Sequence, residues 1–318
     1  MSAGAADGRP NRTGPGPGEV SGDPVSAIAA ALVDWWTADG CVVLDPWEGE
    51  LGTRSLSPQA FFGLAGGEPV RWVSRQVVRQ PSEARYGRSP VRQVRSTQVR
   101  ALLRPAPEDL FARFLASLRR RELGLLDCEL RLRPTDWRVR DLGVGGVGWL
   151  VLLDGLLVAR FVELRAAGAV PVEPATEITY GIERLGLVAS GHRSLPRLQD
   201  ARCRVLAAQR RREEQELSRH LLEVLDEGEL MGRLERALAA AEQALEERLA
   251  VPAFEAILRG ISCAEVLRAR GAFRTLREAR AGRRLTELSA GCRVLVAPAR
   301  PLGDSSECGA TAGKSGDV

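Results

Sequence analysis

The pattern of apolar and polar positions along the chain changes once, near residue 199. Before that point, short apolar runs of β-forming residues are separated by turn residues, which is typical of strands. After it, charged residues alternate with Leu and Ala at helical spacing as far as about residue 284. The pattern therefore predicts an α+β domain with an antiparallel sheet, followed by a helical region.

Local signals place the elements of the first part. Asp154-Gly155 lies between two apolar runs and predicts a two-residue hairpin. Apolar residues at helical spacing predict helices over residues 26–36 and 110–123, and a strand is expected to lead into a helix within residues 177–190. The other expected strands cover residues 41–44, 70–78, 91–104, 128–133 and 148–164.

Both ends of the chain differ in composition from the middle. Residues 1–24 are rich in Gly and Pro, and the last residues are rich in Gly and Ser, so neither end can form a core. We therefore divide the chain into four parts. They are a disordered tail at residues 1–24, an α+β domain at 25–195, a helical domain at 196–300 and a disordered tail at 301–318.

The composition restricts the class of protein. A hydrophobic content of 44% excludes a wholly disordered chain, and no apolar stretch reaches the roughly 20 residues of a membrane helix. The six cysteines contain no CxxC pair, and two histidines are too few for a site with several His ligands. With no secretory signal visible at the N-terminus, we expect a cytoplasmic protein with no membrane partner and no metal bound by its own side chains.

Residues 143–148 read GVGGVG and match the glycine pattern of dinucleotide-binding loops. Such a loop needs a strand before it and a helix after it, whereas the segment that follows here is rich in β-forming residues. We interpret these glycines instead as positions where backbone approaches backbone, or a ligand, closely.

Positive charge is concentrated in residues 71–104, although the formal net charge of the whole chain is only +4. Two interpretations stay open: a solvated sheet face in an arginine-rich chain, or a surface that binds polyphosphate or nucleic acid through planar guanidinium groups. The stretch holds one acid, Glu83, and nine arginines, at positions 71, 75, 79, 85, 88, 92, 95, 100 and 104.

The most specific segment, residues 177–185, reads EITYGIERL. It predicts a strand, a glycine kink and a helix start, with Arg184 able to point back over the edge of the sheet. The segment resembles motif 3 of class II aminoacyl-tRNA synthetases, and more closely the α subunit of the bacterial tetrameric glycyl-tRNA synthetase. Residues 79–98, which include RQP and RYG, are similar to the motif 2 hairpin of that family, and residues 34–69 are similar to its motif 1 region. The resemblance covers about residues 27–275.

The resemblance implies a class II fold, in which an antiparallel sheet is flanked by helices. It also implies a ligase that activates an amino acid with ATP and transfers it to tRNA. Two catalytic arginines follow from it: Arg79 at the carboxylate and α-phosphate, and Arg184 at the γ-phosphate and adenine. Glu177 and Thr179 are the implied amino-acid-binding residues, and Mg²⁺ would bridge phosphate oxygens. The implied ATP-binding residues are Arg79, Arg85, Arg92, Gln98 and Arg184. The family also implies a homodimer, with a separate β-type subunit that binds tRNA.

Several positions depart from the family pattern. Gln80 stands where the family has a second arginine, and Arg138 where it has an acid. Strand positions that carry the polar and aromatic residues of the glycine pocket are here occupied by others, among them Leu150, Leu152 and Arg160. Because such changes remove hydrogen bonds that give specificity, two functions stay open. One is activation of glycine or another small acid for transfer to tRNA. The other is a repurposed or catalytically inactive paralogue, acting as a binding or regulatory module or loading a non-tRNA acceptor.

Overall fold

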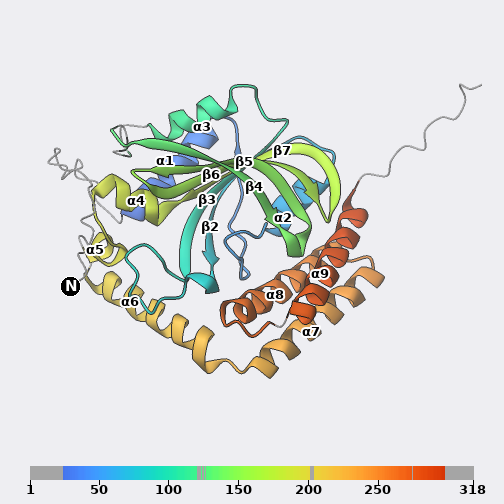
Figure 1. Ribbon diagram of the computed structural model, residues 1–318. Helices are drawn as coiled ribbons and strands as arrows, with labels where there is room; N and C mark the ends of the chain where they lie inside the picture. Colours follow the sequence, from blue (N-terminus) through green and yellow to red (C-terminus); the bar gives the residue numbers. More distant parts are fainter. Residues whose placement is uncertain are drawn as a thin grey trace, which may run out of the picture.

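The computed structural model describes residues 24–119, 123, 125, 127–200, 204–273 and 275–297 (Figure 1). The predicted tails lie outside these residues, except for Pro24, which begins the first helix. Within the described part, one sheet separates two large clusters of buried apolar side chains. A smaller third cluster lies among the C-terminal helices.

The sheet has seven strands in the order β1-β2-β3-β7-β6-β5-β4. Neighbouring strands are antiparallel, except that β1 pairs with β2 in parallel at one edge. The predicted antiparallel α+β fold is therefore confirmed, with β1 as the exception. The strands are β1 (Val42–Val43), β2 (Val70–Arg79), β3 (Arg95–Arg104), β4 (Leu130–Val139), β5 (Val144–Leu153), β6 (Leu156–Ala167) and β7 (Val170–Gly181).

Three helices pack on one face of the sheet: α1 (Pro24–Ala38), α3 (Leu110–Leu118) and α4 (Ile182–Ser190). Polar atoms inside this layer are paired. Trp36 Nε1 of α1 donates a hydrogen bond of 3.1 Å to the hydroxyl of Tyr180 on β7, and that hydroxyl lies 2.7 Å from Ser117 Oγ of α3. Because Trp36, Tyr180 and Ser117 are all buried, this face is closed by packing. A site on the sheet must therefore lie on the other face or at the strand ends.

The opposite face is partly covered by α2 (Pro58–Ala65), α8 (Ala250–Ala269) and α9 (Thr275–Val296), as Figure 1 shows. Phe61 of α2 stacks on Phe254 of α8 with ring centroids 4.3 Å apart, and both belong to the same buried cluster as Val162 of β6. The predicted helical region is confirmed, and it packs directly against the sheet. The domain boundary at residues 195 and 196 stays a prediction. The other helices are α5 (Leu195–Asp200), α6 (Arg204–Arg219), the π-helical turn η4 (His220–Val224) and α7 (Glu227–Glu246).

Two predictions about glycines are confirmed. Asp154 and Gly155 form the turn between β5 and β6 with φ angles of +47° and +79°, which a tight hairpin turn with two left-handed residues requires. The GVGGVG segment lies largely in β5 and leads into no helix. A Cβ atom on Gly148 would lie 2.1 Å from the carbonyl oxygen of Phe161, so glycine is what lets β5 approach β6.

Several boundaries differ from the sequence-based expectation, and two of them have a clear structural cause. Helix α3 ends at Leu118, five residues before the predicted end, where the amide of Arg119 donates to the carbonyls of Leu115 and Ala116. Strand β4 continues to Val139, beyond the predicted end at residue 133, because it pairs with β5 along its whole length. Among the described helices, none combines the length and the apolar character needed to cross a membrane.

Candidate active site

Polar side chains lie in register across three central strands, on the face opposite α1 and α4. Thr179 of β7 pairs with Arg100 of β3 on one side and with Arg160 of β6 on the other. Glu177 lies two residues earlier on β7 and therefore shares this face, because side chains alternate along a strand. The centre of the sheet thus carries two arginines and one carboxylate close together.

Arg160 is hydrogen-bonded to the carboxylate of Glu177, the residue for which the family resemblance implies a role in amino-acid binding. Its Nη2 donates hydrogen bonds of 2.8 Å to Glu177 Oε2 and of 3.0 Å to Thr179 Oγ1. Arg100 Nη1 lies 4.0 Å from Glu177 Oε1. Glu177 is only 2% exposed, so its charge is balanced within the protein by these two guanidinium groups.

Arg100 is held by a short stretch of backbone before α2. Its guanidinium donates to the carbonyl oxygens of Gly52, Thr53 and Ser55, and its Nε donates to Gln98 Oε1 at 2.8 Å. Burial, with a further contribution from the positive charge of Arg160, lowers the pKa of Arg100 to about 10. The group is therefore still a cation at neutral pH, in a buried position.

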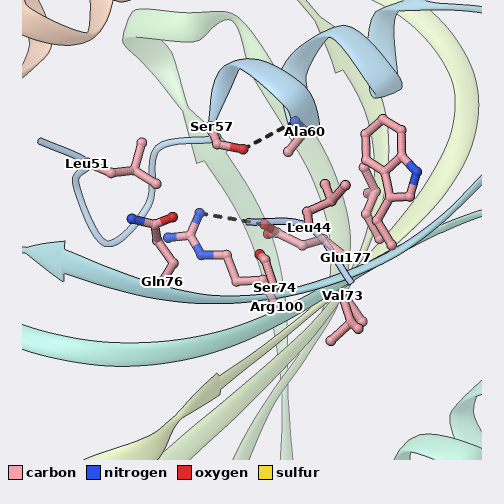
Figure 2. Close-up of a pocket in the computed structure, with 12 residues that line it drawn as sticks. Leu44, Leu51, Ser57, Ala60, Val73, Ser74, Gln76, Arg100 and Glu177 are labelled. Carbon is pink, nitrogen blue, oxygen red and sulfur yellow. Dashed lines mark hydrogen bonds and ion pairs between the residues drawn. The ribbon is translucent and has the colours of Figure 1, made fainter. Parts of the chain in front are cut away.

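A small cavity of about 30 Å³ opens beside Arg100 and Glu177. Figure 2 shows α2 above it, with Ser57 and Ala60 over the side chain of Gln76 and the sheet. Ser57 caps this helix, since its Oγ accepts a 3.3 Å hydrogen bond from the amide of Ala60. The cavity is small and suits part of a small acid.

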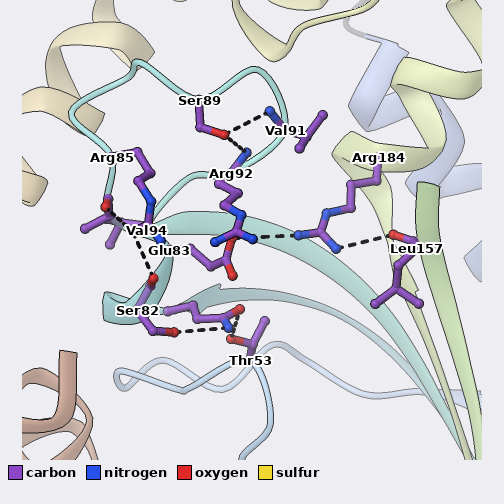
Figure 3. A network of polar contacts seen from close by, with 12 residues as sticks. Thr53, Ser82, Glu83, Arg85, Ser89, Val91, Arg92, Val94, Leu157 and Arg184 are labelled. Atoms are coloured by element: carbon purple, nitrogen blue, oxygen red, sulfur yellow. Dashed lines mark hydrogen bonds and ion pairs between the residues drawn. The ribbon is translucent and has the colours of Figure 1, made fainter. Parts of the chain in front are cut away.

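A second cluster lies at the 3₁₀ turn η1 (Pro81–Glu83), which follows β2. Arg92 Nε lies 3.5 Å from Glu83 Oε2, and Arg184 Nη2 lies 4.0 Å from the same oxygen. Arg184 Nη1 also donates to the carbonyl of Leu157 at 3.3 Å. Figure 3 shows these side chains together at the end of the sheet. Two guanidinium groups from distant parts of the chain share one carboxylate, so the cluster carries a net positive charge.

Helix α6 fixes the loop that carries Arg85 and Arg92. The amide of Tyr86 donates to Ser218 Oγ at 3.0 Å, and the amide of Val94 donates to Glu214 Oε2 at 2.7 Å. Burial raises the pKa of Glu214 above its usual range. The helical region therefore positions part of the site as well as covering the sheet.

The other predicted site residues lie around these clusters. Arg79 Nη1 donates to Glu50 Oε2 at 3.1 Å, and no contact joins Arg79 to Arg184 among the residues that the structure describes. Arg85 donates to the carbonyls of Ser82 and Ala84 within its own loop. The sequence-based roles of Arg79 and Arg85 stay predictions.

Gln80, the neighbour of Arg79, faces the polar row more directly. Its Oε1 accepts a 2.9 Å hydrogen bond from Thr53 Oγ1, and the carbonyl of Thr53 accepts in turn from Arg100 and Gln98. Gln80, which stands where the family has a second arginine, therefore lies beside Thr53, whose carbonyl oxygen is hydrogen-bonded to Arg100 and Gln98.

Sequence reasoning does not single out Arg100 and Arg160 as site residues. Arg100 is only one of nine arginines in its stretch, and Arg160 counts only as a departure from the family. The nine arginines do not form one basic surface, since Arg71 pairs with Asp39 and the buried Arg104 donates to backbone carbonyls. The signal that points to Arg100 is its spacing from Gln98: the two residues are two positions apart in a strand, so their side chains lie on the same face of the sheet.

The two clusters differ in the chemistry they suit. The guanidinium groups of Arg92 and Arg184 offer planar donors around a single acid, an arrangement suited to phosphate oxygens. The central row offers two cations around Glu177, the buried Arg100 and the largely buried Arg160, next to a small cavity. The first arrangement thus suits a polyphosphate, and the second suits a small acid.

The antiparallel sheet, with motif 3 running from β7 into α4, is that of a class II aminoacyl-tRNA synthetase. Residues 25–297 match the family described as glycyl-tRNA synthetase alpha subunit, and the chain belongs to that family of tRNA ligases. The resemblance expected from residues 177–185 is thereby confirmed.

Among solved structures, the chain is similar to pyrrolysyl-tRNA synthetase from Desulfitobacterium hafniense. The two sequences are 13% identical, and the alignment covers 58% of this chain and 76% of that chain, with a TM-score of 0.41. A similarity of this size identifies no shared site residues.

Proposed function

We propose that this chain uses ATP to activate a small carboxylic acid, glycine or another, as an acyl-adenylate for transfer to tRNA. The observation that carries the proposal is the meeting of Arg92 and Arg184 at Glu83. This cluster lies at the end of the sheet, and the centre of the same sheet holds the row of Arg100, Glu177 and Arg160 with the small cavity beside it. Membership of a tRNA ligase family supports the same reaction.

In the proposed reaction, a carboxylate oxygen of the acid attacks the α-phosphorus of ATP. A bond between that oxygen and phosphorus forms, the bond from the α-phosphorus to the bridging oxygen breaks, and pyrophosphate leaves. Arg92 and Arg184 would bind phosphate oxygens in place of Glu83, and Arg85 and Arg79 would approach from the same loop and strand end. Gln98 would act through Arg100, which it orients. Catalysis of this kind depends on position and charge, and Mg²⁺, when bound, neutralises phosphate oxygens.

We also propose that the chain forms a homodimer and acts with a β-type subunit that binds tRNA. The support is the family, which is an alpha subunit by description. In such an assembly this chain would supply the adenylating site, and the partner would bring the acceptor end of the tRNA to it. We further propose that the assembly works in the cytoplasm.

A specific observation favours a second candidate function, a paralogue repurposed for another acid or for a non-tRNA acceptor. Glu177, which would face the ammonium group of an amino acid, is paired internally with Arg160 at 2.8 Å. An amino acid would have to displace that buried ion pair to use Glu177. A catalytically inactive binding module is the extreme form of the same candidate.

ATP–pyrophosphate exchange with a panel of acids tests the proposed function. We expect exchange that depends on an added acid, is lost in Arg184→Ala, and is retained in Arg193→Ala, which changes an exposed arginine just beyond α4. Exchange with glycine alone favours the family role, and exchange with another acid favours the repurposed one. No exchange with any acid, even with a β-type subunit present, would overturn the proposal.

A further inference from the structure

We propose that the acid bound and activated by this chain is a small dicarboxylic acid, whose second carboxylate occupies the place where an amino acid carries its ammonium group. This inference rests on the proposed function, since it names the class of acid that the same site accepts. It is carried by the row of Arg100, Glu177 and Arg160 on the face of the sheet opposite α1 and α4.

Glu177 is already paired with a cation of the protein. A site that binds an amino acid needs an acceptor for the ammonium group, and Glu177 with Thr179 would be that acceptor. Here both side chains accept hydrogen bonds from the same atom, Arg160 Nη2, at 2.8 and 3.0 Å. Arg160 is thus a built-in cation at the position where the ligand's ammonium group would lie. A second cation at that position would be repelled.

Two guanidinium groups share the carboxylate of Glu177. Arg100 and Arg160 are both nearly buried, and Glu177 is the carboxylate within ion-pair distance of each of them. Arg54 is a third cation near Arg160: burial and the charge of Arg160 lower its pKa, and the charge of Glu265 acts in the opposite direction. A buried cation without a partner is unfavourable, and an anionic ligand group would supply the missing negative charge.

Two buried N–H donors beside this row remain unused within the described part of the chain. Arg160 Nε and Trp137 Nε1 are buried and have no hydrogen-bond partner among the described residues. The two side chains lie together, with the Arg160 guanidinium carbon 4.4 Å from the centre of the Trp137 ring. An ammonium group only donates hydrogen bonds and cannot satisfy these N–H groups. A carboxylate only accepts and can satisfy them.

A cavity of about 30 Å³, lined in part by Arg100 and Glu177, lies beside this row, and malonate, a three-carbon dicarboxylic acid, is a suitable probe. One carboxylate oxygen of the acid would attack the α-phosphorus of ATP, and pyrophosphate would leave with the electrons of the broken bond. The second carboxylate would stay unchanged beside Arg160 and hold the first in position.

Titration calorimetry of the full chain with malonate, acetate and glycine, each with a non-hydrolysable ATP analogue present, tests the inference without requiring turnover. We expect malonate to bind at least tenfold more tightly than either glycine or acetate. Arg160→Gln should remove that preference and improve glycine binding, because it frees Glu177. Arg165→Gln, a matched change on the same strand at an exposed ion pair with Glu163, should keep the preference.

Glycine binding as tight as malonate, or tighter, would overturn the inference while leaving acid activation intact. An unchanged preference in Arg160→Gln would also overturn it. Binding of the ATP analogue to each variant checks that the variant is folded, since Arg92 and Arg184 form a separate cluster. Failure of the proposed function looks different: the expected binding preference would be measured, and pyrophosphate exchange would be absent with every acid.

Discussion

Neutralising Glu177 tests whether the central row is an electrostatic unit. The perturbation is Glu177→Gln, which keeps the size of the side chain and removes its charge. Arg160 Nη2 lies 2.8 Å and Arg100 Nη1 4.0 Å from the carboxylate oxygens. At an effective dielectric constant of about 20, these separations correspond to attractions of roughly 6 and roughly 4 kcal/mol, before the opposing cost of desolvation. Breaking a buried ion pair leaves an uncompensated charge, so we expect a net loss of about 3–5 kcal/mol in the free energy of unfolding.

Urea unfolding at neutral pH measures this loss. Glu163→Gln is the matched control, because it removes a carboxylate from the neighbouring strand, where its ion pair with Arg165 is exposed. We expect the control to cost less than about 1 kcal/mol. In a double-mutant cycle with Arg160→Gln, the two changes should be non-additive by at least about 1 kcal/mol. Equal effects of Glu177→Gln and Glu163→Gln, with additive behaviour in the cycle, would refute the reasoning.

Three further predictions concern other parts of the molecule. Arg184→Ala should weaken ATP binding by about 10- to 100-fold in equilibrium dialysis, because it removes charged hydrogen bonds to phosphate, whereas Arg193→Ala should not. Burial raises the pKa of Glu265 to about 7, so the folded state holds this proton more tightly than the unfolded chain. The free energy of unfolding therefore falls as pH rises from about 4.5 to about 7. Above that range, the Glu265→Gln variant should have a free energy of unfolding higher than that of the natural chain by up to about 3 kcal/mol. Gly148→Ala should cost about 1–3 kcal/mol in thermal unfolding, because its Cβ would meet Phe161 O at 2.1 Å.

Each of these has a result that contradicts it. Equal ATP affinity in the Arg184 and Arg193 variants would show that Arg184 does not bind phosphate. A stability difference between Glu265→Gln and the natural chain that stays constant with pH would show that Glu265 titrates normally. Gly145→Ala is the control for the last prediction, since its Cβ would find its nearest neighbour at 3.9 Å. Equal effects of the two glycine changes would argue against close approach of β5 and β6 at Gly148.

Elements set by local sequence are the ones that the sequence predicts well. The hairpin at Asp154 and Gly155 needs two left-handed residues, and the pair DG between apolar runs signals it directly. The change from β7 to α4 at Gly181 and the helical spacing of α1 are local in the same sense. The family resemblance of residues 177–185 then extends the prediction to the class of fold.

The central row could not be predicted in the same way, because it depends on long-range register. β7 lies between β3 and β6, so Thr179 comes to separate Arg100 from Arg160, which are 60 positions apart in the chain. Nothing in the sequence near either arginine reports that alignment. The strand end shows a related difficulty: the sequence points to the side chain of Arg79, whereas the hydroxyl of Thr53 donates its hydrogen bond to the side chain of Gln80.

A crystal structure with ATP and Mg²⁺ bound tests the central claim most directly. The account predicts phosphate oxygens within hydrogen-bond distance of the guanidinium groups of Arg92 and Arg184, with Glu83 displaced from between them. It would be contradicted by a nucleotide bound elsewhere on the molecule while Glu83 keeps its contacts with both arginines.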